Sequence, residues 1–306
     1  MQFCDLKEAF GALIAIPVTP FSESGEVDFV SLRRLIDDLV TGGITVVTPN
    51  GNTSEFYSLS PNECRSTLKA TVEAAGGRAL VVAGVGFDVA TAAEMARFAR
   101  QVGADAIMVH QIIHPFSTHQ GWVSYHQAIA EAVPELGILP YVRDSRVTPE
   151  MVLDLLGSCP NVVGVKYAVP DTLQFASMVH KVGANRLAWV CGIAESWAPF
   201  FWVGGARGFT SGLVNVQAKL SLDMLARLRV GDYRGAMQIW SRLKPFEDLR
   251  ARLNSGNNVS VIKEAMAQLG LCGRTVRPPL SELPERERFE VADILSDWSV
   301  RAPVRA

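Results

Sequence analysis

The sequence predicts an α/β fold, a (β/α)8 TIM barrel with a helical extension at its C-terminus. Short apolar segments typical of buried strands alternate with helical segments over about 215 residues, and eight such strands can be counted. Eight units fit a closed barrel better than an open doubly wound sheet, and no GxGxxG motif follows the first strand. From Gln217 onward no strand pattern occurs. We therefore expect a catalytic barrel at residues 1–215 and a helical extension packed on it at residues 216–306.

The expected strands share a short apolar run followed by a polar or glycine-containing turn. They cover residues 12–17, 44–49, 79–85, 106–110, 137–141, 162–166, 187–191 and 208–210. Three helix starts are marked by Asp28 as an N-cap, by the capping-box pattern Ser60-Pro61-Asn62-Glu63 and by Thr148-Pro149. Helical spacing of apolar residues predicts further helices at 90–102, 122–133, 173–182, 197–203, 217–229, 233–253, 259–269 and 284–298.

Composition excludes several classes of protein. The chain has 306 residues, of which 48% are hydrophobic, and a formal net charge of −2, as in an ordinary soluble globular protein. Basic residues form no run, which argues against nucleic acid, and no apolar stretch reaches the ~18 residues of a membrane span. The N-terminus has no basic leader region, and the five cysteines are scattered without a ligand spacing. We expect reduced thiols and a cytoplasmic location.

A lysine lies in the middle of the sixth expected strand. Residues 161–169 are apolar and β-branched enough to be buried on both faces, yet they include Lys166. Burial of an unpaired ammonium is costly, and proteins commonly respond by lowering the pKa of the amine. The neutral amine that results is the state a Schiff-base lysine requires. The alternative is that Lys166 reaches solvent at the strand end or pairs with a structural carboxylate.

The fifth expected strand ends in Tyr141, about 25 residues before Lys166. This spacing is one βαβ unit, so the phenol and the amine should meet at the same edge of the sheet. The C-terminal strand ends of a barrel carry its chemistry. The polar residues that follow the strands are Asn52, Thr53, Ser54, Glu55, His110, Gln111, His114, Tyr141, Arg143, Asp144, Arg146, Lys166, Ser211, Gly212 and Asn215. Amine, phenol, hydroxyl and guanidinium groups together suit the binding of a carboxylate and the formation of an imine on a neighbouring ketone.

Several of these residues also have structural interpretations. Tyr141 could be a buried tyrosine bonded to a backbone carbonyl, and Thr53 and Ser54 could be turn or cap residues. His110 and His114 have the spacing of a metal pair only on a helix, whereas their surroundings indicate a loop, so we expect no metal. The segment 208–212, which includes Thr210 and Ser211, could cradle a phosphate, but no lysine accompanies it.

Five motifs together resemble the dihydrodipicolinate synthase / N-acetylneuraminate lyase family in order and spacing. They are Pro17-Val18-Thr19-Pro20-Phe21, Gly51-Asn52-Thr53-Ser54-Glu55, Tyr141 with its polar turn, Gly164-Val165-Lys166 and Gly208-Phe209-Thr210-Ser211-Gly212. The resemblance covers essentially the whole chain. It implies that Lys166 forms an imine with pyruvate or another 2-oxo acid and that Tyr141 relays protons, positioned by the hydroxyl of Thr53.

The resemblance also implies substrate contacts. The Asn52-Thr53 loop would hold the carboxylate of the 2-oxo acid, with Ser54, Thr210 and Ser211 as further candidates. Arg146 lies where the synthases keep an arginine for a second carboxylate. Arg143 and Asp144 stand where the family usually has Asn-x-Pro, and this pair resembles the branch that dehydrates 5-keto-4-deoxyglucarate. Glu55-Phe56 and the tail segment 276–280 resemble that branch as well.

Two departures bear on the substrate. Ser54 replaces the usual glycine, and the segment 110–115 lacks the tyrosine with which synthases complete their proton relay across a subunit interface. We expect a Schiff-base-forming lyase that acts on a 2-oxo acid by aldol cleavage or condensation, or that dehydrates a 2-keto-3-deoxy sugar acid, without a cofactor. The alternatives are a dihydrodipicolinate synthase that condenses pyruvate with aspartate semialdehyde and a catalytically silent 2-oxo-acid-binding protein. The resemblance implies tetramers built from tight dimers through the strand-four region, which is apolar here, so we also expect a homo-oligomer, either a dimer or a tetramer.

Overall fold

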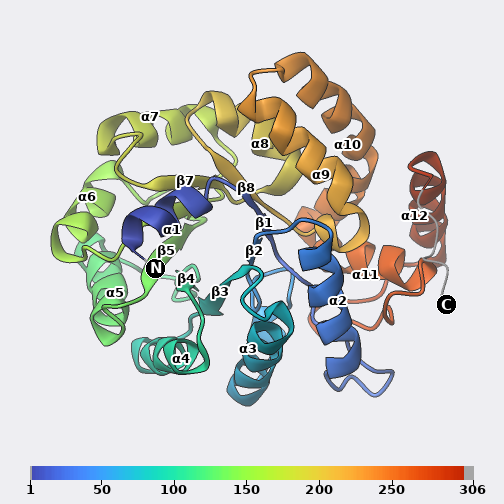
Figure 1. The fold of residues 1–306 in the computed structure, drawn as a ribbon, viewed down its shortest axis with the longest axis horizontal. Helices are drawn as coiled ribbons and strands as arrows, with labels where there is room; N and C mark the ends of the chain where they lie inside the picture. The colour runs from blue at the N-terminus through green and yellow to red at the C-terminus, as the bar shows by residue number, and fades with distance from the viewer. Residues whose placement is uncertain (1, 300–306) are drawn as a thin grey trace.

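The computed structural model describes residues 2–299 and contains a closed barrel of eight parallel strands. Each strand pairs with its neighbours in chain order, and β1 pairs with β8 to close the ring (Figure 1). The strands are β1 (Leu13–Ala15), β2 (Val46–Val47), β3 (Leu80–Val85), β4 (Ala106–Val109), β5 (Gly137–Val142), β6 (Gly164–Tyr167), β7 (Ala188–Cys191) and β8 (Gly208–Ser211). The predicted barrel is therefore confirmed, and each predicted strand has a counterpart in it.

Helices surround the strands. They are α2 (Phe29–Thr41), α3 (Pro61–Ala75), α4 (Val89–Val102), α5 (His119–Ala132), α6 (Pro149–Ser158), α7 (Thr172–Val182), α8 (Ala194–Val203) and α9 (Val214–Arg229). The predicted helix starts are confirmed by their caps. Asp28 accepts hydrogen bonds from the N–H groups of Val30 and Ser31, and Ser60 and Glu63 form the capping box of α3.

A short helix at the N-terminus, α1 (Phe3–Ala9), was not predicted. It lies across one end of the barrel (Figure 1), where Leu6 and the following Phe10 join the cluster of side chains inside the barrel. Leu6 is so close to β5 that a Cβ atom on Gly137 would lie 2.7 Å from its Cδ1. The helix therefore closes the end of the barrel opposite the C-terminal strand ends, and the site must open at the other end.

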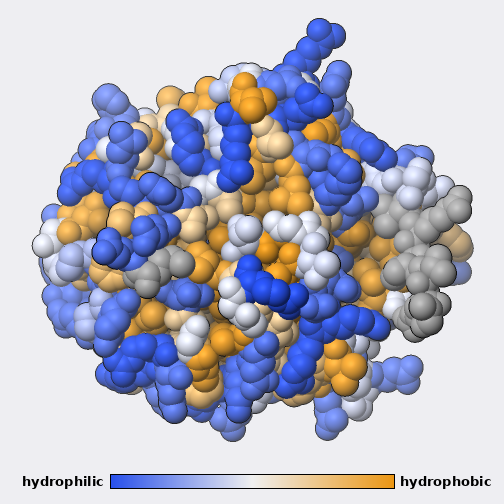
Figure 2. Space-filling model, in the orientation of Figure 1, coloured by the Kyte–Doolittle hydropathy of each residue, from blue (hydrophilic) through white to orange (hydrophobic). Residues whose placement is uncertain are grey.

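The two hydrophobic clusters follow the geometry of the fold. The larger cluster lies between strands and helices, and the smaller fills the barrel with residues such as Ile14, Val82 and Met108. Figure 2 shows hydrophilic side chains around the rim of the face viewed in Figure 1, with hydrophobic residues between them toward the middle. Within residues 2–299 no helix combines the length and the apolar character that crossing a bilayer requires.

The last third of the described chain is helical, as predicted, with α10 (Tyr233–Ser255), α11 (Asn258–Gln268) and α12 (Glu285–Asp297). Helix α10 packs against α8 and α9, and α11 packs against α9 and α10 (Figure 1). The predicted division between residues 215 and 216 falls just inside α9, which contacts β1 and α2. A catalytic barrel at 1–215 and an extension at 216–306 remain a prediction.

Candidate active site

Lys166 and Tyr141 are direct neighbours on adjacent strands. The parallel pairing of β5 with β6 sets Tyr141 opposite Lys166, as the spacing of the two residues predicted. Both side chains line a cavity of about 350 Å³ that residues of α10 and α11 also line. The amine and the phenol are thus brought together at a concave site of the size expected for a small-molecule ligand.

The environment of Lys166 favours a neutral amine. Its side chain is only 3% exposed, and it has no hydrogen bond or ion pair with any residue from 2 to 299. Nζ lies 3.9 Å from the centroid of the Tyr141 ring. Burial, together with the nearby positive charge of Arg143, lowers the pKa of Lys166 to about 7. The lysine stem fits because residue 192 is glycine, where a Cβ atom would lie 2.9 Å from Cγ of Lys166.

This environment predicts a specific pH dependence. If Lys166 is the nucleophile, kcat/KM should fall about tenfold per pH unit below pH 7, because an amine with a pKa of about 7 is protonated there and cannot attack a ketone. The fall should begin at higher pH in Arg143→Gln, because loss of the neighbouring positive charge allows the pKa of Lys166 to rise. A pH–rate profile of both enzymes checks this. If kcat/KM fell over the same pH range in both enzymes, the charge of Arg143 would not be a cause of the lowered pKa of Lys166.

The hydroxyl of Tyr141 is held by Asn52 and not by Thr53. Nδ2 of Asn52 donates a hydrogen bond of 3.3 Å to this hydroxyl. Thr53 lines the cavity, and its hydroxyl has no hydrogen bond to any residue in the described range. Within the described residues Asn52, and not Thr53, makes the hydrogen bond to the phenol, and a positioning role of Thr53 stays a prediction. Burial raises the pKa of Tyr141, so the phenol is protonated at neutral pH and can donate a proton.

The other predicted residues fall into two groups. Asn52, Thr53, Arg143 and Thr210 line the cavity that contains Lys166. Ser54, Asp144, Arg146 and Ser211 are not among its lining residues.

Both serines hold the backbone near the cavity. Ser54 donates a hydrogen bond of 2.5 Å to the carbonyl of Pro17 and accepts one from the N–H of Gly51, so it ties the loop after β2 to the chain after β1. Ser211 accepts a hydrogen bond from the N–H of Val214 and thereby supports the start of α9. Their hydroxyls have the structural function of turn and cap residues.

Arg146 does not line the lysine cavity and is neutralised by Asp144. Its guanidinium donates three hydrogen bonds of 2.6 to 3.0 Å to the Asp144 carboxylate, and its side chain is 64% exposed. The pair lines a separate, open cavity of about 530 Å³. Arg143 lines both cavities and therefore connects them. Arg146 is badly placed to bind a group attached to Lys166.

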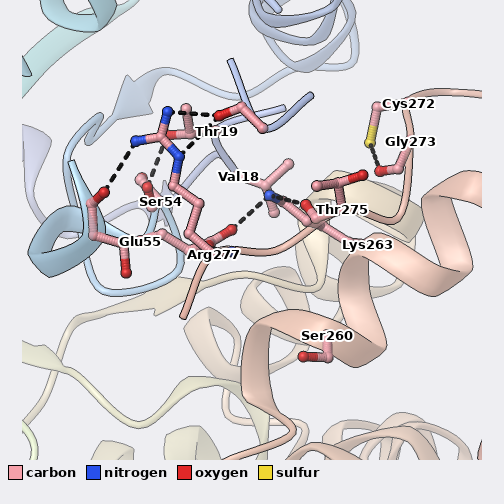
Figure 3. Close-up of polar contacts among 12 residues, drawn as sticks. Val18, Thr19, Ser54, Glu55, Ser260, Lys263, Cys272, Gly273, Thr275 and Arg277 are labelled. Carbon is pink, nitrogen blue, oxygen red and sulfur yellow. Dashed lines mark hydrogen bonds and ion pairs between the residues drawn. The ribbon is translucent and has the colours of Figure 1, made fainter. Parts of the chain in front are cut away.

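The loop that carries Asn52 and Thr53 is clamped by the C-terminal extension. Glu55 ends this loop in a left-handed conformation, with φ of 58°. Its carboxylate accepts hydrogen bonds from Nζ of Lys263 at 2.5 Å and from the backbone N–H of Arg277 at 2.9 Å (Figure 3). The side chains of Lys263 and Glu55 are both fully buried. Glu55 and the segment around Arg277, two of the features that resemble the dehydratase branch, are therefore in direct contact.

The guanidinium of Arg277 extends the clamp. It pairs with Glu63 on α3 and donates to the carbonyls of Gly25 and Ser58. Lys263 and Arg277 both lie over the ring of Phe21, with Nζ and Cζ 4.0 and 4.3 Å from its centroid. In Figure 3 both side chains reach from the C-terminal segment toward the loops that carry Thr19, Ser54 and Glu55. The extension therefore fixes the shape of the loop after β2.

Charged residues of α10 form part of the cavity wall, which the sequence did not predict. Glu247 and Arg250 form an ion pair of 2.5 Å with side chains only 6% and 7% exposed, and both line the cavity. Behind them, on α8, Glu195 is fully buried and accepts a hydrogen bond of 2.5 Å from Ser221. Burial and the nearby Glu247 raise the pKa of Glu195. In the sequence these charges look like the solvated face of a helix, and their burial follows from the packing of α10 against α8 and α9.

Two aromatic side chains lie beside Tyr141. His110 is buried and neutral, because burial lowers its pKa to about 3. Its Nε2 lies 2.7 Å from the carbonyl of Asn50, so it supports the loop after β2. Tyr57, in the 3-10 helix η1 (Phe56–Ser58), packs edge-on against His110 and lines the second cavity. No group of three or more His, Cys, Asp or Glu residues within the described range could hold a metal ion.

Comparison with known proteins agrees with this geometry. A model of the dihydrodipicolinate synthetase family matches residues 9–298. A probable 5-dehydro-4-deoxyglucarate dehydratase from Bradyrhizobium diazoefficiens is 31% identical, over 95% of this chain and 93% of its own length. Another from Allorhizobium ampelinum is 32% identical, over 97% of this chain and 99% of its own length.

Solved structures have the same fold. A dihydrodipicolinate synthase from Bacillus clausii superposes with a TM-score of 0.93 and 43% identity, over 96% of this chain and 100% of its own. A dihydrodipicolinate synthase from Oceanobacillus iheyensis gives a TM-score of 0.94 and 38% identity, over 97% of this chain and 99% of its own.

Proposed function

Because this chain belongs to the dihydrodipicolinate synthetase family, we propose that it dehydrates a hydroxylated 2-oxo acid with a second carboxylate, of the 5-dehydro-4-deoxyglucarate type. The protein is a lyase of the class I aldolase type that forms a Schiff base with a 2-oxo acid. We assign Lys166 as the nucleophile because its amine is buried, has no hydrogen-bond or ion-pair partner among the described residues, and lies beside the Tyr141 ring.

The proposed reaction follows from the chemistry of an imine. The neutral amine of Lys166 attacks the ketone, and loss of water gives an imine, which in its protonated form withdraws electrons from the adjacent methylene. Removal of a proton from that carbon forms an enamine, and the enamine expels the hydroxyl of the next carbon as water. Hydrolysis then releases the product and restores the amine. Tyr141, held by Asn52, is the proposed proton relay for these steps.

Three observations favour dehydration over condensation with aspartate semialdehyde. The segment after β4 has no tyrosine to complete the synthase relay. The arginine that the resemblance assigned to a second carboxylate is neutralised by Asp144 and lies outside the lysine cavity. Glu55 and Arg277, both in features that resemble the dehydratase branch, form one buried network. Dihydrodipicolinate synthesis is the second candidate, because solved structures up to 43% identical carry that name.

A substrate panel tests the proposal. Purified protein is incubated with 5-dehydro-4-deoxyglucarate, with other 2-oxo acids, and with pyruvate plus aspartate semialdehyde, and water loss, pyruvate release and condensation are followed. We expect water loss from the dicarboxylate to be the fastest reaction. Condensation at a kcat/KM of ~10⁴ M⁻¹s⁻¹ or more would reverse the order of the two candidates. Binding without turnover of any substrate would favour a silent binding protein.

Removal of the Tyr141 hydroxyl should slow the reaction without preventing imine formation. We expect Tyr141→Phe to reduce kcat by roughly 10²–10⁴-fold, because a positioned proton donor is lost while Lys166 remains. Stopped-flow kinetics and borohydride trapping measure the two effects separately. Tyr233→Phe, on the half-exposed tyrosine that begins α10, is the matched control and should behave as wild type. Equal loss of trapping and of turnover in Tyr141→Phe would contradict a proton-relay role.

We further propose that the protein is a homo-oligomer, as a dimer or tetramer, with contacts through the segment after β4. Ile113 and Phe116 in this segment are 61% and 80% exposed, which is unusual for large apolar side chains so close together. Light scattering should give a dimer or larger species at micromolar concentration. A monomer would remove this part of the proposal.

A further inference from the structure

We propose that Arg250 binds the second carboxylate of the substrate while Lys166 holds the 2-oxo end. This inference rests on the proposed function and assigns a specificity-determining role to a residue of the C-terminal extension. Arg250 lies on α10 and lines the same cavity as Lys166, Tyr141 and Thr53.

The guanidinium of Arg250 is fixed by two partners. Nη1 donates to the carboxylate of Glu247 at 2.5 Å. Nε and Nη2 donate to Oδ1 of Asn258 at 3.0 and 2.6 Å. Both partners lie on helices, so the planar group is held in one orientation before any ligand arrives. Such pre-organisation reduces the entropy lost on binding.

These contacts leave donors free for a ligand. A guanidinium has five N–H groups, and one on Nη1 and one on Nη2 have no partner among residues 2–299. A carboxylate is the group that an arginine binds with two parallel N–H donors. Nη2 of Arg250 and the methyl of Thr53 lie 2.9 and 3.1 Å from the position that a Cβ atom on Gly212 would occupy. Nη2 of Arg250 is therefore near the loop proposed to hold the 2-oxo end.

Two other arginines are poorer candidates. Arg146 has a side chain that is 64% exposed, and it does not line this cavity. Arg143 lines it but is exposed, and no side-chain hydrogen bond holds its guanidinium among the described residues. Arg143 can attract an anionic substrate and lowers the pKa of Lys166, whereas the buried Arg250 can fix the position of a carboxylate.

The chain directly after Arg250 is strained. Leu253, Asn254 and Ser255 have φ values of 55°, 54° and 67°, which are costly for residues other than glycine. Asn254 and Ser255 line the cavity beside Arg250. Strained residues of this kind cluster at active sites and ligand clamps. The wall that α10 contributes therefore has the features of a substrate-binding surface.

The test compares substrates with one and two carboxylates. We expect the charge-balanced variant Glu247→Gln/Arg250→Gln to raise KM for 5-dehydro-4-deoxyglucarate by roughly 10–100-fold, the range for loss of a charged hydrogen-bonded pair. Borohydride trapping of pyruvate on Lys166 should change by less than about threefold, because pyruvate has no second carboxylate. Arg250→Lys keeps a positive charge beside Glu247, so the buried carboxylate is not left without a partner. This variant should give a smaller increase in KM. Arg242→Gln, earlier on α10, is the matched control.

Each outcome has a distinct meaning. An equal effect on pyruvate trapping would show that Arg250 acts on the shared 2-oxo end, which overturns the inference. An unchanged KM in both Arg250 variants, or a larger effect of Arg146→Gln, would also overturn it. If the double variant does not fold by circular dichroism, Arg250→Lys decides between these outcomes. Failure of the wild-type protein to form an imine with any 2-oxo acid would instead refute the proposed function.

Discussion

Replacement of Lys166 by alanine should abolish turnover of every 2-oxo acid substrate. We expect kcat to fall by about 10⁴-fold or more, because no other amine lines the cavity within the described residues and the electron sink is lost with the imine. Incubation of wild-type enzyme with pyruvate and borohydride should add the mass of the reduced adduct to the peptide that carries Lys166. Mass spectrometry of the variant should show no adduct.

The same change should not destabilise the fold. Lys166 has no hydrogen bond or ion pair to lose among residues 2–299, and burial of its amine lowers the pKa to about 7, so protonation opposes folding. The free energy of unfolding of Lys166→Ala at pH 7 should therefore be close to that of wild type, apart from the loss of packing by the lysine stem. Lys181→Ala, on an exposed residue of α7, controls for loss of a lysine as such and should keep full activity and trapping. An adduct retained in Lys166→Ala would place the nucleophile elsewhere.

The sequence was sufficient for the barrel because its strands are continuous apolar runs at regular spacing. Lys166 and Tyr141 could be predicted because strand order fixes which residues meet at the edge of a parallel sheet. Helix α1 escaped prediction, since its seven residues bury only Leu6 and leave too short a pattern.

The rest of the site depends on tertiary structure. Asn52 and Thr53 are adjacent in one loop, and only the fold of that loop decides which side chain reaches Tyr141. Arg250 follows Lys166 by more than eighty residues, and its place in the cavity depends on how α10 packs against α8 and α9. Arg146 looked available in the sequence, but its carboxylate partner is only two residues away. The pairing of Arg146 with Asp144 and the packing of α10 therefore explain why the residues that line the cavity differ from those expected.

The second large effect is expected at Lys263, which does not itself line the cavity. Lys263→Met leaves the carboxylate of Glu55 buried without its cation, because both side chains of this pair are 0% exposed. Loss of one partner of a buried pair typically costs about 3–5 kcal/mol of stability. We expect a decrease of this size in the free energy of unfolding, measured by urea denaturation.

A double variant separates the cost of the buried charge from the cost of lost packing. Glu55→Gln/Lys263→Met removes both charges and should recover much of the stability lost in Lys263→Met, because no uncompensated charge is then buried. Lys263→Met should also lower kcat, since Glu55 ends the loop that carries Asn52 and the hydrogen bond to Tyr141. Lys244→Met, on a partly exposed lysine of α10 in an ion pair with Asp248, is the control. It should change the free energy of unfolding by no more than about 0.5 kcal/mol, and kcat by no more than the corresponding factor. If the double variant were no more stable than Lys263→Met, the cost would come from lost packing over Phe21 and not from the buried charge.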